Sequence, residues 1–321
     1  MFLQIQIAET SGQVKSLMRH TFNKSMTHSL RDKTILITGA CSGIGLALSR
    51  RVVSRGARLI GIGHTRKRCE TAADFLLEDG NKSRFVLLPS ELSLMSKVRD
   101  LSVKIKDQLS DWGTDTLDAL VLNAAAVPYR QIWTGEGLDT QWAVNYLSGF
   151  LLTHLLMAEL ARVGNARLIS VSSDSHYRTR IRWHDLQSKR FYHPLLAYKQ
   201  SKLAQVIFSV EFNRRLKNHT GITALVADPG LVQTGIGFKG NSHWMSFFWK
   251  MRSKNGQSPE SAANDILFLL EEDDVLQSGH VYWKYRQPKT PNRFALNEVE
   301  SVRLWDISMK MAGLDARDSS L

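Results

Sequence analysis

Two kinds of hydrophobic segment alternate along most of this chain. Short, nearly continuous apolar runs have the length of buried strands, and between them apolar residues recur at the three- and four-residue spacing of a helix. The predicted strands are residues 33–38, 58–62, 85–88, 117–122, 167–171, 222–227 and 280–283. The predicted helices are residues 44–55, 66–77, 93–109, 196–217 and 259–271, and a further long helix lies within 137–163.

This alternation predicts an α/β fold. Repeated strand–helix units with apolar strands are typical of a parallel sheet that is covered on both faces. We therefore expect a single Rossmann-type, doubly wound parallel sheet with helices on both faces. No linker rich in Pro, Gly or Ser divides residues 31–321, which we predict to form one domain.

Residues 1–30 do not continue this pattern. They carry Lys15, Arg19 and Lys24 against a single acid, Glu9, together with several Ser and Thr residues. We interpret the segment as a poorly ordered N-terminal extension. A transit peptide and an amphipathic surface segment are the alternatives.

The composition limits the classes of function. The chain is 43% hydrophobic and 22% charged, a globular balance, and its net charge of +12 would suit nucleic acid, an anionic membrane or an anionic cofactor. No zinc-finger spacing or RNA-binding signature occurs, so we expect no nucleic-acid partner, and we predict no metal site. Two cysteines are too few for a disulfide framework and favour a reducing compartment.

No apolar run reaches the roughly 18 to 20 residues that a membrane-spanning helix needs. We therefore expect no transmembrane span. The predicted location is intracellular, either cytoplasmic or peripherally associated with a membrane.

The first predicted strand leads into a glycine-rich turn. The turn reads Thr38-Gly39-Ala40-Cys41-Ser42-Gly43-Ile44-Gly45 and is followed by a helical pattern. In this context glycines permit a tight turn and let a pyrophosphate approach the helix N-terminus. An ordinary strand-to-helix turn is the alternative. We interpret Cys41 as filling a permissive position, with a reactive, low-pKa thiol as the less favoured alternative.

The end of the second predicted strand bears on the choice of cofactor. NAD sites usually place an acid about 20 residues after the glycine motif. Here the corresponding segment is His64-Thr65-Arg66-Lys67-Arg68, and the next acid is Glu70. A basic cluster without a carboxylate suits a 2′-phosphate, so we expect NADP to be preferred, with NAD as the alternative.

A tyrosine and a lysine stand four residues apart within the predicted helix 196–217. Tyr198 and Lys202 would therefore lie on the same face of that helix. The positive charge of the lysine favours phenolate and lowers the pKa of the tyrosine, which can then give or take a proton. Isolated pairs of this kind are more often surface pairs, so the elements upstream decide the interpretation.

Six elements in this order resemble the short-chain dehydrogenase/reductase family. They are the glycine turn, Asn123, Asn145, Ser173, the pair Tyr198 and Lys202, and Asp228-Pro229-Gly230. The resemblance covers about residues 31–315. The runs at 184–187, 197–204 and 303–305 resemble the retinol-dehydrogenase-like subgroup more closely.

The resemblance implies a role for each element. Tyr198 would be the general acid in reduction and the general base in oxidation, and Lys202 would lower its pKa and hold the nicotinamide ribose. Ser173 would hydrogen-bond the substrate oxygen, and Asn145 would hold a water that relays protons. A strand-end hydroxyl and a structural amide are the alternatives for Ser173 and Asn145. The cofactor-binding set comprises Gly39, Ser42, Gly43, Ile44, Gly45, His64, Arg66, Asn123, Tyr198, Lys202, Pro229, Gly230 and Thr234.

The chain departs from the family pattern at several positions. Ala125 replaces a glycine, which adds a Cβ where the backbone runs close to the cofactor. His64 stands where the subgroup usually has arginine, and Glu91 replaces an aspartate after the third strand. The subgroup's usual N-terminal membrane helix is not expected here.

We expect a substrate loop at about residues 230–258. Within it, Trp244, Phe247, Phe248 and Met251 follow the spacing of one helix face, with basic residues close by. An apolar lid is favoured, and the alternatives for 244–251 are peripheral membrane contact or packing on the core or on a dimer mate.

These elements together predict a function. We expect an NADP-dependent oxidoreductase that interconverts a carbonyl and an alcohol on a lipophilic substrate that is retinoid-, steroid- or fatty-aldehyde-like. A homo-oligomer is a further hypothesis. The alternative function is a catalytically weak cofactor-sensing or scaffold protein on the same fold.

Overall fold

The computed structural model describes residues 30–79, 82–233 and 256–315. These residues form one eight-stranded sheet with the strand order β3-β2-β1-β4-β5-β6-β7-β8. The bounds are β1 Thr34–Thr38, β2 Arg58–Gly63, β3 Phe85–Pro89, β4 Ala119–Leu122, β5 Arg167–Val171, β6 Thr223–Asp228, β7 Tyr282–Lys284 and β8 Gln287–Pro288. β1 to β7 pair in parallel, and β8 pairs with β7 in an antiparallel hairpin.

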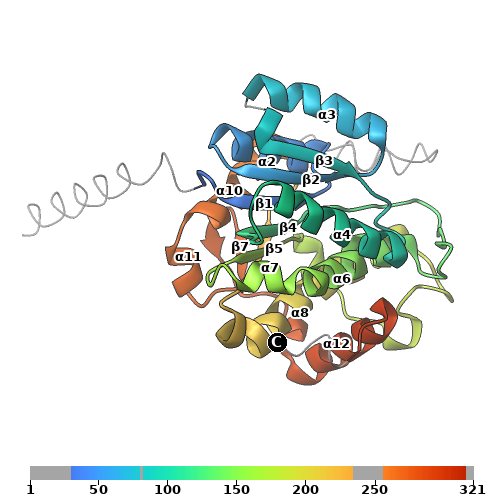
Figure 1. The fold of residues 1–321 in the computed structure, drawn as a ribbon. Coiled ribbons are helices and arrows are strands. Elements are labelled where there is room, and N and C mark those ends of the chain that lie inside the picture. The colour runs from blue at the N-terminus through green and yellow to red at the C-terminus, as the bar shows by residue number, and fades with distance from the viewer. Residues whose placement is uncertain (1–29, 80–81, 234–255, 316–321) are drawn as a thin grey trace, which may run out of the picture.

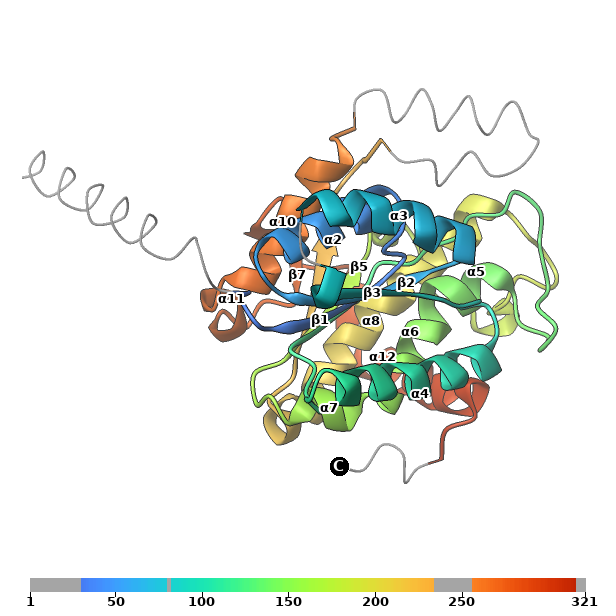
Figure 2. The ribbon, with the colours of Figure 1, turned by 45° about the horizontal axis from the view of Figure 1, so that its top comes forward.

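The central strands are apolar because both of their faces are covered. Every residue of β1, β4, β5 and β6 is buried. One helix layer contains α2 (Gly43–Ser54), α3 (Arg66–Asp79) and α10 (Pro259–Glu271), and the opposite layer contains α4 (Met95–Asp111), α6 (Ser148–Leu155), α8 (Pro194–Thr220) and α12 (Glu298–Ala312). Figures 1 and 2 show the two helix layers on either side of the sheet. A separate hydrophobic core fills the interface between the sheet and each layer. The predicted doubly wound α/β fold is confirmed.

The helix predicted within 137–163 is interrupted. The segment contains α5 (Thr140–Trp142), a π-helical turn (Ala143–Leu147), α6, and α7 (Met157–Ala161) after a break at Leu156. The described residues also contain the short helix α11 (Asp274–Gln277) and the 3₁₀ turns Lys82–Arg84, Asp174–Arg178, Trp183–Asp185 and Arg293–Leu296. Side-chain periodicity did not reveal the π turn, which is a single-turn bulge inside an otherwise helical segment.

The hydrophobic pattern of the sequence predicted neither α12 nor β8. Local signals mark α12, because the side chain of Asn297 caps its N-terminus by accepting from the backbone N–H of Glu300 at 3.2 Å and Gly313 ends it in the left-handed conformation. β8 has only two residues and pairs solely with β7, so it leaves no apolar run.

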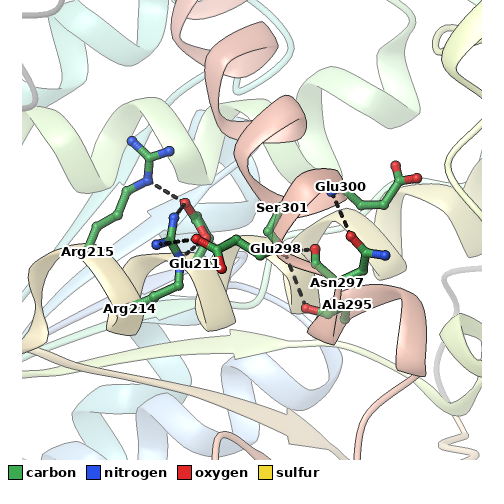
Figure 3. Close-up of polar contacts among 8 residues, drawn as sticks. All are labelled: Glu211, Arg214, Arg215, Ala295, Asn297, Glu298, Glu300 and Ser301. Carbon is green, nitrogen blue, oxygen red and sulfur yellow. Dashed lines mark hydrogen bonds and ion pairs between the residues drawn. The ribbon is translucent and has the colours of Figure 1, made fainter.

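A polar network attaches α12 to α8 (Figure 3). The buried carboxylate of Glu211 accepts from Arg214 at 2.8 and 2.6 Å and is also bonded by Arg215. Burial alone would raise the pKa of Glu211, but the two guanidinium groups hold it below its usual value. Arg214 reaches onward to Glu298 of α12 at 2.9 Å, so the network fixes the helix that carries Tyr198.

No helix within residues 30–79, 82–233 and 256–315 has the length and hydrophobicity needed to cross a lipid bilayer.

Candidate active site

The glycine turn lies between the end of β1 and the start of α2. Gly39 and Gly43 adopt positive φ values of 69° and 53°, which favour glycine. A Cβ on Gly45 would lie 2.1 Å from the carbonyl oxygen of Gly39, so the start of the helix packs directly on the turn. The turn therefore requires glycine at these positions for both conformation and close packing.

Asn123 fastens this turn to the end of β4. Its side-chain amide donates to the carbonyl oxygens of Thr38 at 2.9 Å and Gly39 at 3.3 Å. The hydroxyl of Thr38 accepts from the backbone N–H groups of Asn123 and Ala124, both at 3.0 Å. β1 and β4 are neighbours where the strand order changes direction, and ligands of open α/β sheets bind in the crevice at that point.

The turn has the features of a dinucleotide pyrophosphate site. Ser42 precedes α2 without a side-chain capping bond, and the first turn of the 12-residue helix carries no acid. The N–H groups of this turn and the helix dipole therefore favour an anion. Ser42, Gly43 and Ile44 are the residues that would present them.

Gly45→Ala is expected to lower the free energy of unfolding by about 2–3 kcal/mol, because the added Cβ meets backbone rather than a flexible side chain. Urea unfolding measures the change. Gly135→Ala is the matched control, since Gly135 has no heavy atom within 4 Å of a built Cβ and should shift stability little. Equal stability of the two variants would contradict the close packing of the turn.

The basic segment after β2 contains a histidine–carboxylate pair. His64 Nδ1 lies 3.4 Å from Glu91 Oε2, and the two side chains are 56% and 41% exposed. Arg66 begins α3 and is exposed. The parallel pairing of β2 with β3 brings Glu91, which follows β3, beside His64. The carboxylate of Glu91 thus lies close to the segment 64–68, which contains no acid of its own.

Tyr198 and Lys202 lie together near the start of α8. Lys202 Nζ is 5.6 Å from the centroid of the Tyr198 ring and donates to the Val171 carbonyl at 2.7 Å and to Gln205 Oε1 at 3.1 Å. Burial lowers the pKa of Lys202 to about 7, although the carboxylate of Asp228 partly opposes this. Near neutral pH this lysine can therefore hold or release its proton.

Asn145 lies in the π-helical turn, a feature often found at functional sites. Its Oδ1 accepts from the backbone N–H of Ala126 at 2.7 Å, and its Nδ2 donates to the Ala126 carbonyl and to Ser201 Oγ, both at 3.1 Å. Ser201 Oγ in turn donates to the carbonyl of Tyr198 at 2.8 Å. Asn145 thus links the loop after β4 to α8, and its role in a water relay stays a prediction.

Ser173 follows β5 by two residues and precedes the turn Asp174–Arg178. Its hydroxyl oxygen accepts from the backbone N–H of Ser175 at 3.3 Å, which is the structural role considered as the alternative. A hydroxyl that accepts one bond can still donate another, so Ser173 keeps a hydrogen for a substrate oxygen. The adjacent Ser172 points elsewhere and donates to the Lys202 carbonyl at 3.0 Å.

A buried polar cluster was missed by the sequence analysis. Asp228 accepts from the backbone N–H of Gly230 at 2.8 Å and from the Tyr282 hydroxyl at 2.5 Å. Burial and the nearby Asp174 raise the pKa of Asp228 to about 6. Asp174 forms an ion pair with Lys284, 110 residues away in sequence, so no local signal could have found this contact. The cluster joins the ends of β5, β6 and β7.

The cluster also positions the segment after β6. Pro229 and Gly230 follow that strand, and a Cβ on Gly230 would lie 2.1 Å from the Tyr285 hydroxyl. Thr234 and the segment 244–251 lie outside the described residues. Among the described residues no group of three or more metal-ligating side chains occurs.

Cys41 does not have the low pKa considered in the sequence analysis. Burial, and then the neighbouring Cys69, raise the pKa of the Cys41 thiol to about 12. The alternative of a thiol activated by the helix N-terminus is therefore wrong.

The doubly wound sheet with a glycine turn at its switch point defines a Rossmann-type nucleotide-binding protein. The family model for short chain dehydrogenase matches residues 33–243, and the chain belongs to this family of oxidoreductases. It is 32% identical over 285 residues to retinol dehydrogenase 12 of Mus musculus, covering 88% of this chain and 87% of that one. It is 30% identical over 293 residues to human retinol dehydrogenase 13, covering 88% and 86%.

Solved structures share the fold. An uncharacterised protein from Mycobacterium paratuberculosis superposes with a TM-score of 0.70 at 26% identity, covering 90% of this chain and 97% of that one. The angucycline C-6 ketoreductase LanV with bound NADP has a TM-score of 0.64 at 23% identity, covering 80% and 95%.

Proposed function

We propose that this protein is an NADP-dependent oxidoreductase that interconverts a carbonyl and an alcohol on a lipophilic substrate, with Tyr198 as the acid/base. The observation that carries the proposal is the buried Lys202 beside Tyr198 on α8. Burying a lysine costs free energy, and residues with strongly shifted pKa values cluster at functional sites. Membership in the family indicates an oxidoreductase, and the pair Tyr198 and Lys202 provides the group that would transfer a proton.

The glycine turn would hold the pyrophosphate, and Lys202, Pro229 and Gly230 would contact the nicotinamide end. When bound, the nicotinamide supplies or accepts the hydride at the carbonyl carbon. Asn123 and Asn145 act by positioning, because each ties a loop to a neighbouring element. Fixed positions matter here, since a displacement of about 1 Å can cost about a hundredfold in rate.

The proton balance rests on Tyr198. During reduction its hydroxyl donates to the substrate oxygen as negative charge develops there, and during oxidation the phenolate accepts the proton. A protonated Lys202 stabilises the phenolate. Ser173 would donate a hydrogen bond to the same substrate oxygen and orient it.

Apolar side chains beside these residues support a lipophilic substrate. Tyr177, Leu231 and Tyr285 are 39%, 40% and 52% exposed. Tyr177 follows Ser173 within one short turn, and Leu231 and Tyr285 adjoin Gly230. Exposed aromatic surface at a proposed site favours apolar ligands. The names of the retinol dehydrogenase relatives make retinoids the first class to test.

NADPH is expected to bind at least tenfold more tightly than NADH, because the exposed guanidinium of Arg66 suits a 2′-phosphate. Arg66→Ala should remove most of this difference. Fluorescence titration with both cofactors measures it, with Lys104→Ala on α4 as a control for the change in net charge. Equal affinities of the parent protein would show that the acid at Glu91 outweighs the basic segment.

Residues 31–321 are proposed to act as one dinucleotide-binding catalytic domain with its substrate loop at about 230–258. Peripheral membrane association through 244–251 and homo-oligomer formation belong to the same proposal. A lipophilic substrate residing in a membrane would favour the first of these.

NADPH consumption by the purified protein against a panel of retinoid, steroid and fatty aldehydes and ketones tests the function. Turnover that varies with chain length or ring size would support an oxidoreductase with an apolar pocket. NADPH binding without turnover across the panel would contradict it and favour the cofactor-sensing alternative.

A further inference from the structure

The two cysteines of this chain touch each other. Cys41 Sγ and Cys69 Sγ lie 3.7 Å apart although 28 positions separate them in sequence, and the whole chain contains only these two. Cys41 belongs to the glycine turn and Cys69 to the first turns of α3. Both are free thiols.

Gly63, the last residue of β2, makes room for the two sulfur atoms. A Cβ at this position would lie 2.4 Å from Cys69 Sγ and 2.6 Å from Cys41 Sγ. Any other residue would separate the thiols or displace one of them. The pairing is therefore built into the backbone where β2 meets α3.

The two thiols differ in access. Cys69 is 5% exposed, whereas Cys41 is only partly buried. A small solute in water therefore reaches Cys41 first. Cys69 lies behind Cys41 at van der Waals distance, the position of a resolving thiol.

We propose that Cys41 and Cys69 form a site of reversible oxidation, at which a hydroperoxide converts the dithiol into a disulfide across the glycine turn. With hydrogen peroxide, Cys41 sulfur attacks one peroxide oxygen, the O–O bond breaks, and water leaves as Cys41 becomes a sulfenic acid. Cys69 sulfur then attacks Cys41 sulfur, the S–S bond forms, the S–O bond breaks, and a second water leaves. The two thiols lose two electrons and two protons, and a thiol such as glutathione restores them.

The pair rests in the reduced state. Burial raises the pKa of both thiols, that of Cys41 to about 12, so little thiolate is present at neutral pH. Oxidation is therefore slow and requires peroxide to accumulate.

Disulfide formation would constrain the turn. A disulfide needs a sulfur separation of about 2.05 Å, so the two sulfur atoms must approach by roughly 1.7 Å from their present 3.7 Å, and the bond then links the glycine turn covalently to α3. Cys41 stands between Ala40 and Ser42, whose backbone adjoins the proposed pyrophosphate site. Resting on the proposed function, we expect NADPH affinity to fall by about tenfold in the oxidised protein.

The test treats the full-length protein with hydrogen peroxide and maps its peptides without reduction. The expected result is a linked pair of peptides containing Cys41 and Cys69, a mass lower by about 2 Da, and a Tm higher by about 5 °C, because the cross-link restricts the unfolded chain. Dithiothreitol should reverse all three. Cys69→Ala should instead gain about 16 Da at Cys41, because the sulfenic acid has no resolving thiol.

Two unmodified thiols in the treated parent protein, or independently oxidised cysteines without a link, would overturn the site. The disulfide is detected without cofactor or substrate, so its test does not depend on the proposed function. If the reduced protein binds NADPH and the disulfide form binds it equally well, the effect on the cofactor is refuted.

Discussion

Tyr198→Phe is expected to lower turnover about a thousandfold while leaving NADPH affinity within about threefold of the parent value, since general acid–base groups contribute about 10²–10⁴ in rate. Phenylalanine keeps the ring packed above Lys202 and removes only the hydroxyl that exchanges the proton. Steady-state turnover with the best substrate of the panel, together with a binding titration, separates the two effects.

Tyr129→Phe is the matched control for this substitution. Tyr129 lies half-buried in the loop after β4. Its substitution removes the same hydroxyl at a position outside the proposed chemistry. It should turn over at close to the parent rate. Near-normal turnover in Tyr198→Phe would refute the assignment of Tyr198 as the acid/base.

Lys202→Met is expected to abolish most turnover and yet to stabilise the cofactor-free protein at neutral pH. Burial lowers the pKa of Lys202 from its ordinary 10.5 to about 7 in the folded protein. Between these values the unfolded chain binds a proton that the folded protein does not, so the free energy of unfolding rises with pH. Relative to the variant, the parent protein should gain about 2 kcal/mol between about pH 7 and about pH 9.

Urea unfolding of parent and variant across this pH range measures the effect. Lys104→Met, at an exposed position on α4, removes the same charge from solvent and should leave the pH dependence of the parent unchanged. Parallel stability curves for the parent and Lys202→Met would show that the buried lysine does not lose its proton in this range.

The elements that the sequence predicted well are those that depend on residues close together along the chain. The first strand, the turn and α2 follow from an apolar run and three glycines within 12 positions, and α8 follows from its helical periodicity. Tyr198 and Lys202 come together because one helical turn separates them, which is a local property. The short chain dehydrogenase model matches residues 33–243, a range that contains these motifs.

The long helix predicted within 137–163 shows the limit of this reasoning. Its apolar residues gave a helical pattern, but the segment forms a π turn where Asn145 bonds to α8 and to the loop after β4. Those partners lie elsewhere in the chain. Periodicity within the segment therefore carries no signal of them.

The amino-acid sequence by itself determined the fold class, the glycine turn and the spacing of Tyr198 and Lys202, because each depends on residues that are close along the chain. The tertiary structure alone decided which distant groups meet: Glu91 with His64, Asp174 with Lys284, and Cys41 with Cys69. It also decided that burial lowers the pKa of Lys202 and raises that of Cys41. Strand order and register bring such groups together, and desolvation acts only once the layers have closed over them.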